Sequence, residues 1–200
     1  MGRSSTNLSN TSDMKIKLSF IAIVFFVVTN LQGQVSDNCA ANVILSSYSE
    51  RAYTSEPVAD AQLDVILECG IKAPSARNLQ PWKFTVIKDE ATMKEIVDDV
   101  VPGNVLVVVS GMVSEDGGTP DFDCGLAAEN MFLAAHGLGL GARIYGSPAQ
   151  KINENRGLFQ IPSGYNAVVV LRIGNTDKSV DAISAATQRK SKQEVINYKQ

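Results

Sequence analysis

Histidine and cysteine are scarce in this sequence, and their scarcity argues against two kinds of site. The chain of 200 residues has one histidine, His136, and three cysteines, Cys39, Cys69 and Cys124. Zinc sites usually need several such ligands at paired spacings, and no paired spacing occurs here, so we expect no metal site. Three cysteines are also too few for a disulfide framework.

An excess of charge of one sign is absent as well. The chain has 18 Lys and Arg against 21 Asp and Glu, which gives a formal net charge of −3. We therefore expect no nucleic-acid partner, because such partners need a strongly basic surface. A hydrophobic content of 44% and a charged content of 20% are ordinary for a globular chain. The length suffices for one domain with its own core.

The longest apolar run, from Leu18 to Val28, is too short to span a membrane. It has about eleven residues, whereas a spanning helix needs roughly twenty. Basic residues at 14–17 precede the run and the small residue Gly33 follows it, which is the layout of a secretory signal peptide. A buried N-terminal helix is the alternative, but the run has no polar face. We expect export to the periplasm or the medium, and a cytoplasmic location if this segment is not a working signal.

The rest of the chain divides by composition. Its first residues are rich in Ser, Asn and Thr and lack an apolar period, which predicts disorder. The expected division is a disordered extension at 1–13, a signal peptide at 14–33, a linker at 34–45 and a folded domain at 46–200.

Apolar periodicity predicts several helices and strands in the folded domain. We expect a helix from about 61 to 72 with Asp60 as its N-cap. A long apolar helix is expected at 122–138, starting from Thr119-Pro120-Asp121. The run from Val105 to Val109 predicts a strand buried on both faces. The other predicted elements are a strand at 84–87, a helix at 90–97, a helix at 148–156 and a strand at 167–174.

The stretch from Ala73 to Phe84 has the composition of a binding loop. Pro74 and Pro81 fix φ and lack a backbone donor, so the stretch is neither ordinary helix nor central strand. Four side chains between the prolines can form hydrogen bonds: Ser75, Arg77, Asn78 and Gln80. Such a loop is suited to hold a polar, planar molecule, although a simple polar turn has the same composition.

The pattern Ala-Pro-Ser-x-x-Asn-x-Gln-Pro-Trp-x-Phe in this stretch resembles the signature loop of the FMN-dependent nitroreductase family. The long helix carries Asp-x-Gly-x-Ala-x-Glu-Asn-Met, which is similar to the family's central helix, and matching blocks run from about residue 46 to 198. The resemblance implies an α+β fold with a mixed β-sheet flanked by helices. It also implies a homodimer joined through the central helix, with a C-terminal extension onto the partner.

The resemblance further implies which residues contact FMN at the dimer interface. Pro74, Ser75 and Asn78 of the loop would face the flavin and its ribityl chain. A backbone N–H of Tyr145 or Gly146 would reach flavin N5, the atom that accepts hydride. A backbone donor is physically reasonable there, because glycine allows close approach and N5 gains charge on reduction.

The segment before the first predicted helix is similar to the family's basic Arg-Arg-Ser-x-Arg segment, with one departure. Ser49 and Arg51 match it, and Arg51 would lie near the pyrimidine edge of the flavin, where its charge favours the reduced ring. Ser47 and Tyr48 stand where the family has two basic residues. This departure weakens the expected phosphate site.

Near the C-terminus, the resemblance implies that Arg189, together with Lys190, grips the FMN phosphate. A solvated basic tail is the alternative interpretation of these two residues.

The implied activity is an oxidoreduction in which NAD(P)H reduces FMN and the flavin then reduces a small-molecule acceptor. Nitroaromatics, quinones or similar compounds would be the acceptors, in a ping-pong reaction. Because the flavin performs the chemistry, we expect no catalytic side chain, and His136 is expected to be structural. Two alternatives stay open: an exported flavin-binding protein that does not oxidise nicotinamide, and an exported interaction module without flavin.

Overall fold

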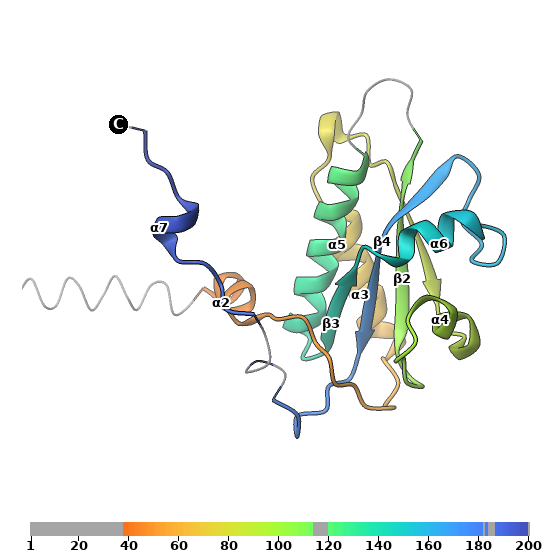
Figure 1. Cartoon of the computed structure of the whole chain (residues 1–200), viewed down its shortest axis with the longest axis horizontal. Coiled ribbons are helices and arrows are strands. Elements are labelled where there is room, and N and C mark those ends of the chain that lie inside the picture. Colours follow the sequence, from red (N-terminus) through yellow and green to blue (C-terminus); the bar gives the residue numbers. More distant parts are fainter. Residues whose placement is uncertain (1–37, 114–119, 182, 184–186, 200) are drawn as a thin grey trace, which may run out of the picture. The chain divides into compact units, whose positions relative to one another are not determined.

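The structure of the chain is a computed structural model that describes residues 38–113, 120–181, 183 and 187–199 (Figure 1). The predicted extension and signal peptide lie outside the described residues, as does Thr119 at the predicted start of the long helix.

The chain forms two compact units, one up to Ser46 and one from Ser47 onward. In the first unit, helix α2 (Cys39–Ser46) lies in the stretch that was expected to be a linker. All other elements belong to the second unit: α3 (Asp60–Ile71), η1 (Ala76–Asn78), β1 (Trp82–Ile87), α4 (Glu90–Ile96), β2 (Val105–Met112), α5 (Pro120–Gly137), β3 (Gly141–Tyr145), α6 (Pro148–Glu154), β4 (Tyr165–Gly174) and α7 (Lys192–Val195).

Four strands form one sheet in the order β1-β2-β4-β3. The α+β class predicted from the sequence is confirmed. All three strand pairings among the described residues are antiparallel, so the parallel pairing that a mixed sheet requires is not among them. β1 and β3 are the edge strands, with β2 and β4 between them. This order separates the segment before β1 from the segment after β3.

Helices cover both faces of this sheet. Val105, Val107 and Val109 of β2 pack into a core formed with α3 and α5. Leu106 and Val108 pack into a second core with α4 and α6. Side chains of a strand alternate between its faces, so the continuous apolar run of β2 supplies both cores. The prediction that this strand is buried on both faces is confirmed, since these five residues are at most 2% exposed.

Helix α5 is close to the predicted span of 122–138, and it packs tightly against α3. A Cβ added at Gly70 of α3 would lie 2.8 Å from Cγ of Met131, which is fully buried. The absence of a side chain at Gly70 thus lets the two helices approach closely. The buried residues of α5 are Asp123, Cys124, Ala127, Ala128, Met131 and Ala135.

One prediction about local structure was wrong, and one strand was missed. Asp60 is not an N-cap: the N-cap of α3 is Ala59, and the Asp60 carboxylate pairs with Lys88 at 2.5 Å instead. Strand β3 was not predicted, because a five-residue segment between glycines with Arg143 inside it has no strong strand signal. It becomes a strand through pairing with β4. Within the described part of the chain, no helix has both the length and the hydropathy that a membrane crossing requires.

Candidate functional site

The loop between α3 and β1, residues 73–81 and hereafter the signature loop, has an unusual backbone. Arg77, Asn78 and Gln80 have φ values of 52°, 57° and 48°. Residues other than glycine seldom adopt this left-handed conformation, which costs free energy and persists only where surrounding contacts impose it. The prediction that Ala73–Phe84 is neither ordinary helix nor central strand is confirmed, since residues 73–81 contain only the short η1 and the rest begins edge strand β1.

Contacts inside the signature loop hold this conformation. The Gln80 N–H donates to Oγ of Ser75 at 3.0 Å, and the Asn78 N–H donates to the Ser75 carbonyl at 3.0 Å. The hydroxyl of Ser75 keeps its own proton for a further bond, because a hydroxyl both accepts and donates. Pro74 and Asn78 are exposed and Ser75 is half-buried. The three predicted loop contacts are therefore accessible to a ligand.

Two polar residues of α5 also hold this part of the chain, and neither was predicted as a site residue. Oδ1 and Oδ2 of Asp123 accept from the Ala76 N–H at 3.2 and 3.3 Å. Nδ2 of Asn130 donates to the Cys69 carbonyl at 3.1 Å. The only sequence signal for them is that polar residues interrupt an otherwise apolar helix.

The second group of predicted residues lies at the opposite edge of the sheet. The Glu50 N–H donates to the Ala142 carbonyl of β3 at 3.0 Å, which places the segment with Ser49 and Arg51 beside β3. Both Ser49 and Arg51 are exposed. The guanidinium carbon of Arg143 lies 4.8 Å from the centre of the Tyr145 ring.

Gly146, just after β3, leaves open space beside the backbone. A Cβ added there would meet no heavy atom within 4 Å, so a planar group has room to approach the main chain. The hydroxyl of Tyr145 is buried and has no hydrogen-bond partner among the described residues.

Tyr48, which stands where the family has a basic residue, is the hydrogen-bond partner of Glu50. This carboxylate is 2% exposed, and its Oε1 accepts from the N–H groups of Arg51 and Ala52 at 2.8 and 3.0 Å. Its Oε2 accepts from the Tyr48 hydroxyl at 3.0 Å. Burial and this bond raise the pKa of Tyr48 above its ordinary value. Tyr48 thus satisfies a buried acid at a position where the resemblance led us to expect a base.

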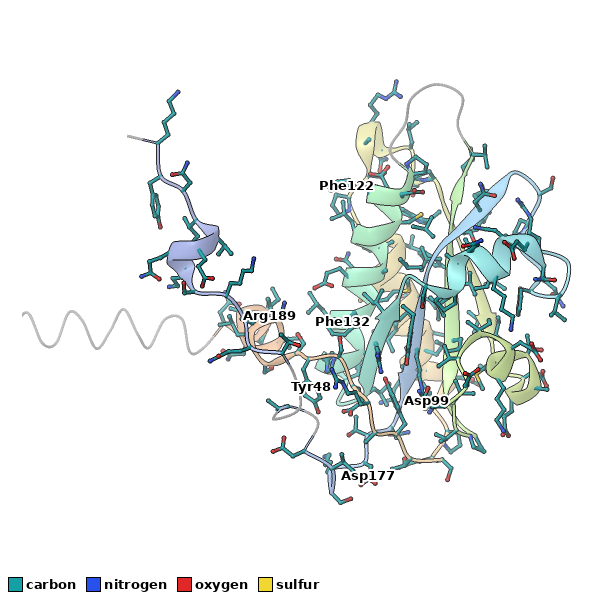
Figure 2. All side chains as sticks on the ribbon, viewed as in Figure 1. Tyr48, Asp99, Phe122, Phe132, Asp177 and Arg189 are labelled. Carbon is teal, nitrogen blue, oxygen red and sulfur yellow. The ribbon has the colours of Figure 1, made fainter. Side chains whose placement is uncertain are left out.

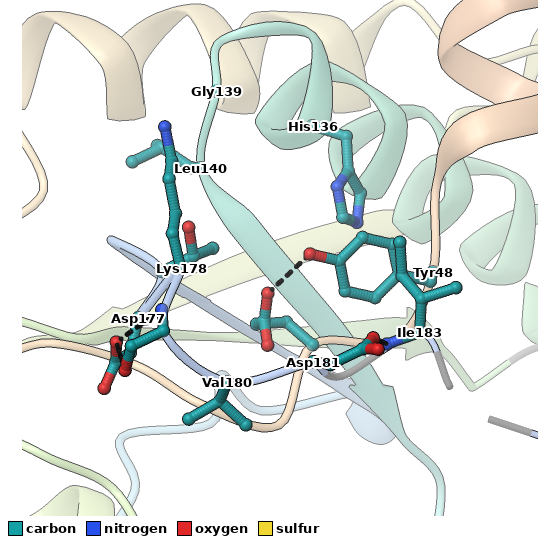
Figure 3. A pocket seen from close by; sticks show the side chains of 12 residues that line it. Tyr48, His136, Gly139, Leu140, Asp177, Lys178, Val180, Asp181 and Ile183 are labelled. Atoms are coloured by element: carbon teal, nitrogen blue, oxygen red, sulfur yellow. Dashed lines mark hydrogen bonds between the residues drawn. The ribbon is translucent and has the colours of Figure 1, made fainter. Parts of the chain in front are cut away.

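A pocket of about 560 Å³ lies beside Tyr48 and Glu50 (Figure 3). The end of α5 and the loop after β4 complete it. The centre of the His136 imidazole lies 5.6 Å from the centre of the Tyr48 ring and 4.7 Å from that of the Phe132 ring. Among the described residues, none of the nine predicted flavin contacts lines this pocket. It is therefore not the predicted site.

The last two predicted contacts, Arg189 and Lys190, are exposed residues before α7, and Figure 2 labels Arg189. Over the described ranges, no cluster of three or more His, Cys, Asp or Glu side chains suits a metal ion. The structure therefore brings Ser49, Arg51 and Tyr145 to the side of β3. It leaves the signature loop beside β1, with two strands between.

Comparisons with known proteins agree with this fold. The model of the nitroreductase family matches residues 44–104 and 114–175. A relative from Methanothermobacter thermautotrophicus is provisionally named NADH dehydrogenase/NAD(P)H nitroreductase. It is 30% identical over 159 residues, which are 74% of this chain and 83% of the relative.

Two solved structures are similar in fold. An FMN-dependent nitroreductase from Clostridium difficile is 26% identical, covers 78% of this chain and 99% of its own, and has a TM-score of 0.61. A nitroreductase with bound FMN from Bacteroides fragilis is 22% identical, covers 80% and 98%, and has a TM-score of 0.68. Since the family model matches more than half of the residues, this chain belongs to the nitroreductase family.

Proposed function

We propose that this chain is an FMN-dependent NAD(P)H oxidoreductase that reduces nitroaromatics, quinones or similar acceptors. The observation that carries the proposal is the signature loop, whose imposed left-handed backbone presents Ser75 and Asn78 to solvent. The similar nitroreductase with bound FMN and the similar FMN-dependent nitroreductase support FMN as the cofactor. The name of the archaeal relative supports NAD(P)H as the electron donor.

The residues present suit this cofactor. FMN has a dianionic phosphate, a polyhydroxyl chain and a flat ring. Arg189 and Lys190 offer two cations for the phosphate, Ser75 and Asn78 offer hydroxyl and amide groups for the polyhydroxyl chain, and the space at Gly146 suits a flat ring.

FMN, when bound, supplies the group that accepts a hydride and delivers electrons to the second substrate. The chain contributes position and charge. Tyr145 and Gly146 offer backbone donors at a site open to close approach. The Arg51 guanidinium favours negative charge that develops on a bound ring. We assign no side chain as a proton donor or nucleophile.

The strand order favours a site built from two copies of the chain. The signature loop adjoins edge strand β1, and Tyr145 ends edge strand β3, so two strands separate the two groups within one chain. A homodimer joined through α5 would bring the two groups together. Phe122, at the N-terminal end of α5 in Figure 2, is 66% exposed and offers apolar surface for such a contact. Sedimentation of the purified protein at several concentrations tests this dimer.

We also propose that the chain is exported, on the sequence of residues 14–33 alone. Cell fractionation of the full chain tests this, with a version lacking residues 1–33 as the control. Recovery of the full chain only in the cytoplasm would contradict export.

The visible spectrum of the purified protein, before and after addition of FMN, tests the cofactor. Flavin absorption that survives gel filtration supports the proposal. NADH and NADPH oxidation in the presence of menadione or nitrofurazone then tests turnover. Bound flavin without turnover would favour the flavin-binding alternative, and a colourless protein that takes up no FMN would overturn both.

A further inference from the structure

A buried carboxylate of helix α5 forms a hydrogen bond with the backbone of the signature loop. Asp123 lies in the first turn of α5 and is 2% exposed. Both of its oxygens accept from the Ala76 N–H, at 3.2 and 3.3 Å, across 47 residues of sequence. Ala76 directly follows Ser75, so this bond orients the peptide group on which the loop conformation depends. The bond is charge-assisted, because a carboxylate accepts it, and the one N–H is shared between the two oxygens.

A second side chain of α5, two turns further along the helix, also forms a hydrogen bond with this part of the chain. Asn130 lies seven positions after Asp123, so the two side chains fall on the same face of α5. Asn130 holds the Cys69 carbonyl, and Cys69 lies seven positions before Ala76. The two anchors thus hold the last turn of α3 and the start of the signature loop against α5.

The anchors require α3 and α5 to be close together. Gly70 meets this requirement, since a side chain there would collide with Met131. The close approach of the two helices therefore allows both the Asn130 bond and the Asp123 bond to form. Together these bonds hold the signature loop against α5.

The three left-handed residues begin directly after Ala76. Each costs on the order of 1 kcal/mol, so the conformation persists only because other contacts enforce it. Inside the loop, relaxation is opposed by the backbone bonds to Ser75 and Ala76 and by a longer bond of 3.4 Å from the Gln80 side chain to the Asn78 carbonyl. Releasing the Ala76 N–H would free the start of the turn that presents Ser75 and Asn78.

We propose that Asp123 is a positioning residue of the flavin site: it holds the Ala76 peptide and thereby keeps Ser75 and Asn78 in their binding orientation. The inference rests on the proposed function. It assigns to the central helix a role in cofactor binding through the loop, in addition to packing.

FMN affinity of three variants of the full chain tests this. D123A removes the acceptor and should weaken FMN binding roughly tenfold, the effect of one charge-assisted hydrogen bond. D123N keeps an acceptor oxygen and should retain most of the affinity. D121A is the matched control, because Asp121 is an exposed acid in the same helical turn. It should leave the affinity within about twofold.

Affinities are measured by flavin fluorescence at a temperature where every variant is folded by circular dichroism. A merely structural role would lower the melting temperature of D123A and D123N alike and leave the affinity of the folded protein unchanged. Unchanged affinity in D123A, or no rescue by D123N, would overturn the proposal.

A76P offers a second route if D123A does not fold. It removes the donor from the loop side, at the first position of η1 after an extended Ser75, where proline is tolerated. It should weaken FMN binding about as much as D123A is expected to. Parent-like affinity in A76P would contradict the proposal.

Hydrogen exchange of the flavin-free protein separates this inference from the proposed function. D123A should accelerate exchange of amides 76–80 and spare those of β2, whereas D121A should change neither. If the parent takes up no FMN, the proposed function fails, and the exchange data still decide whether Asp123 holds the loop. Unchanged exchange in D123A would refute the anchor itself.

Discussion

The guanidinium carbon of Arg172 lies 4.0 Å from the centre of the half-buried Tyr53 ring. Arg172 is 1% exposed, and Nε donates to Oδ1 of Asn104 at 2.8 Å. Nη1 pairs with the Asp99 carboxylate at 3.0 Å, and Nη2 donates to the Asp99 carbonyl at 2.8 Å. Burial raises the pKa of the Tyr53 hydroxyl far above its ordinary value, although the charge of Arg172 acts in the opposite direction. This cluster ties β4 to two loops.

Substitution R172K should lower the free energy of unfolding by about 2 kcal/mol. An ammonium cannot replace the forked hydrogen bonds and the ring stacking of a guanidinium. Arg143 is the matched control, because it lies opposite Arg172 in the strand register and is only half-buried. R143K should cost less than about 1 kcal/mol. Urea denaturation measures both values, and equal losses would contradict the special role of Arg172.

Asn78 allows the contributions of side chain and backbone to be separated at the proposed flavin site. N78G keeps the left-handed backbone without strain and removes the amide, whereas N78A removes the amide and adds strain. Both variants should bind FMN roughly tenfold more weakly, because both lose a hydrogen-bonding group. N78A should also be about 1 kcal/mol less stable than N78G. Wild-type FMN affinity in N78G would show that the amide does not contact the cofactor.

His136 should titrate below its ordinary pKa, because burial disfavours the charged ring more than the Tyr48 backbone and Glu50 favour it. The chain has one histidine, so its imidazole proton resonance can be followed by NMR without assignment. Below pH about 6.5, the unfolded state binds the proton more readily than the folded state, so stability falls as the pH drops. Above that pH, His136 contributes no pH dependence.

Variant H136Q should remove this part of the pH dependence. Urea denaturation at pH 7.5 and pH 5.5 gives the comparison with the parent. A resonance that titrates at or above pH 6.5 would contradict the lowered pKa.

Gly70 and Gly125 form a natural pair for testing the packing of α5. Gly125 has open space where a Cβ would be, so G125A should stabilise the protein by up to about 1 kcal/mol. G70A gains the same helix propensity but pushes on Met131 and Phe84. The two variants should differ by about 2 kcal/mol in the free energy of unfolding. Equal gains in the free energy of unfolding for G70A and G125A would mean that α3 and α5 can move apart at no cost.

The three cysteines should react with a thiol reagent at three different rates. Cys39 is exposed, Cys69 is half-buried and Cys124 is buried. Burial raises the pKa of Cys124 to about 12, so almost no reactive thiolate is present at pH 8. Colorimetric thiol titration should show a fast phase that C39S removes, a slower phase, and a third thiol only in urea. Reaction of all three in the folded protein would contradict the buried position of Cys124.

The elements that the sequence predicted well are those with a signal in their own residues. The apolar run of β2 and the proline start of α5 each carry such a signal. β3 has none, because its strand character comes from pairing with β4, which lies far along the chain. Asp60 was misassigned because its carboxylate has an alternative partner in Lys88, which sequence spacing cannot reveal.

In the candidate site, too, features with a local sequence signal were predicted and features that depend on distant residues were not. The prolines and polar side chains of the signature loop predicted its position and its accessible residues. Its left-handed backbone and its anchor at Asp123 were not predicted, because the anchor joins residues 47 positions apart. The separation of the loop from Tyr145 follows only from the strand order.

The imposed conformation of Arg77, Asn78 and Gln80 bears on the speed of ligand capture. The contacts that enforce it lie within the protein, so the loop has its shape before any ligand arrives. A ligand then binds a loop that is already ordered, so ordering of the loop does not slow the association rate. Differences in affinity among ligands of this loop should therefore reside in how long each one stays.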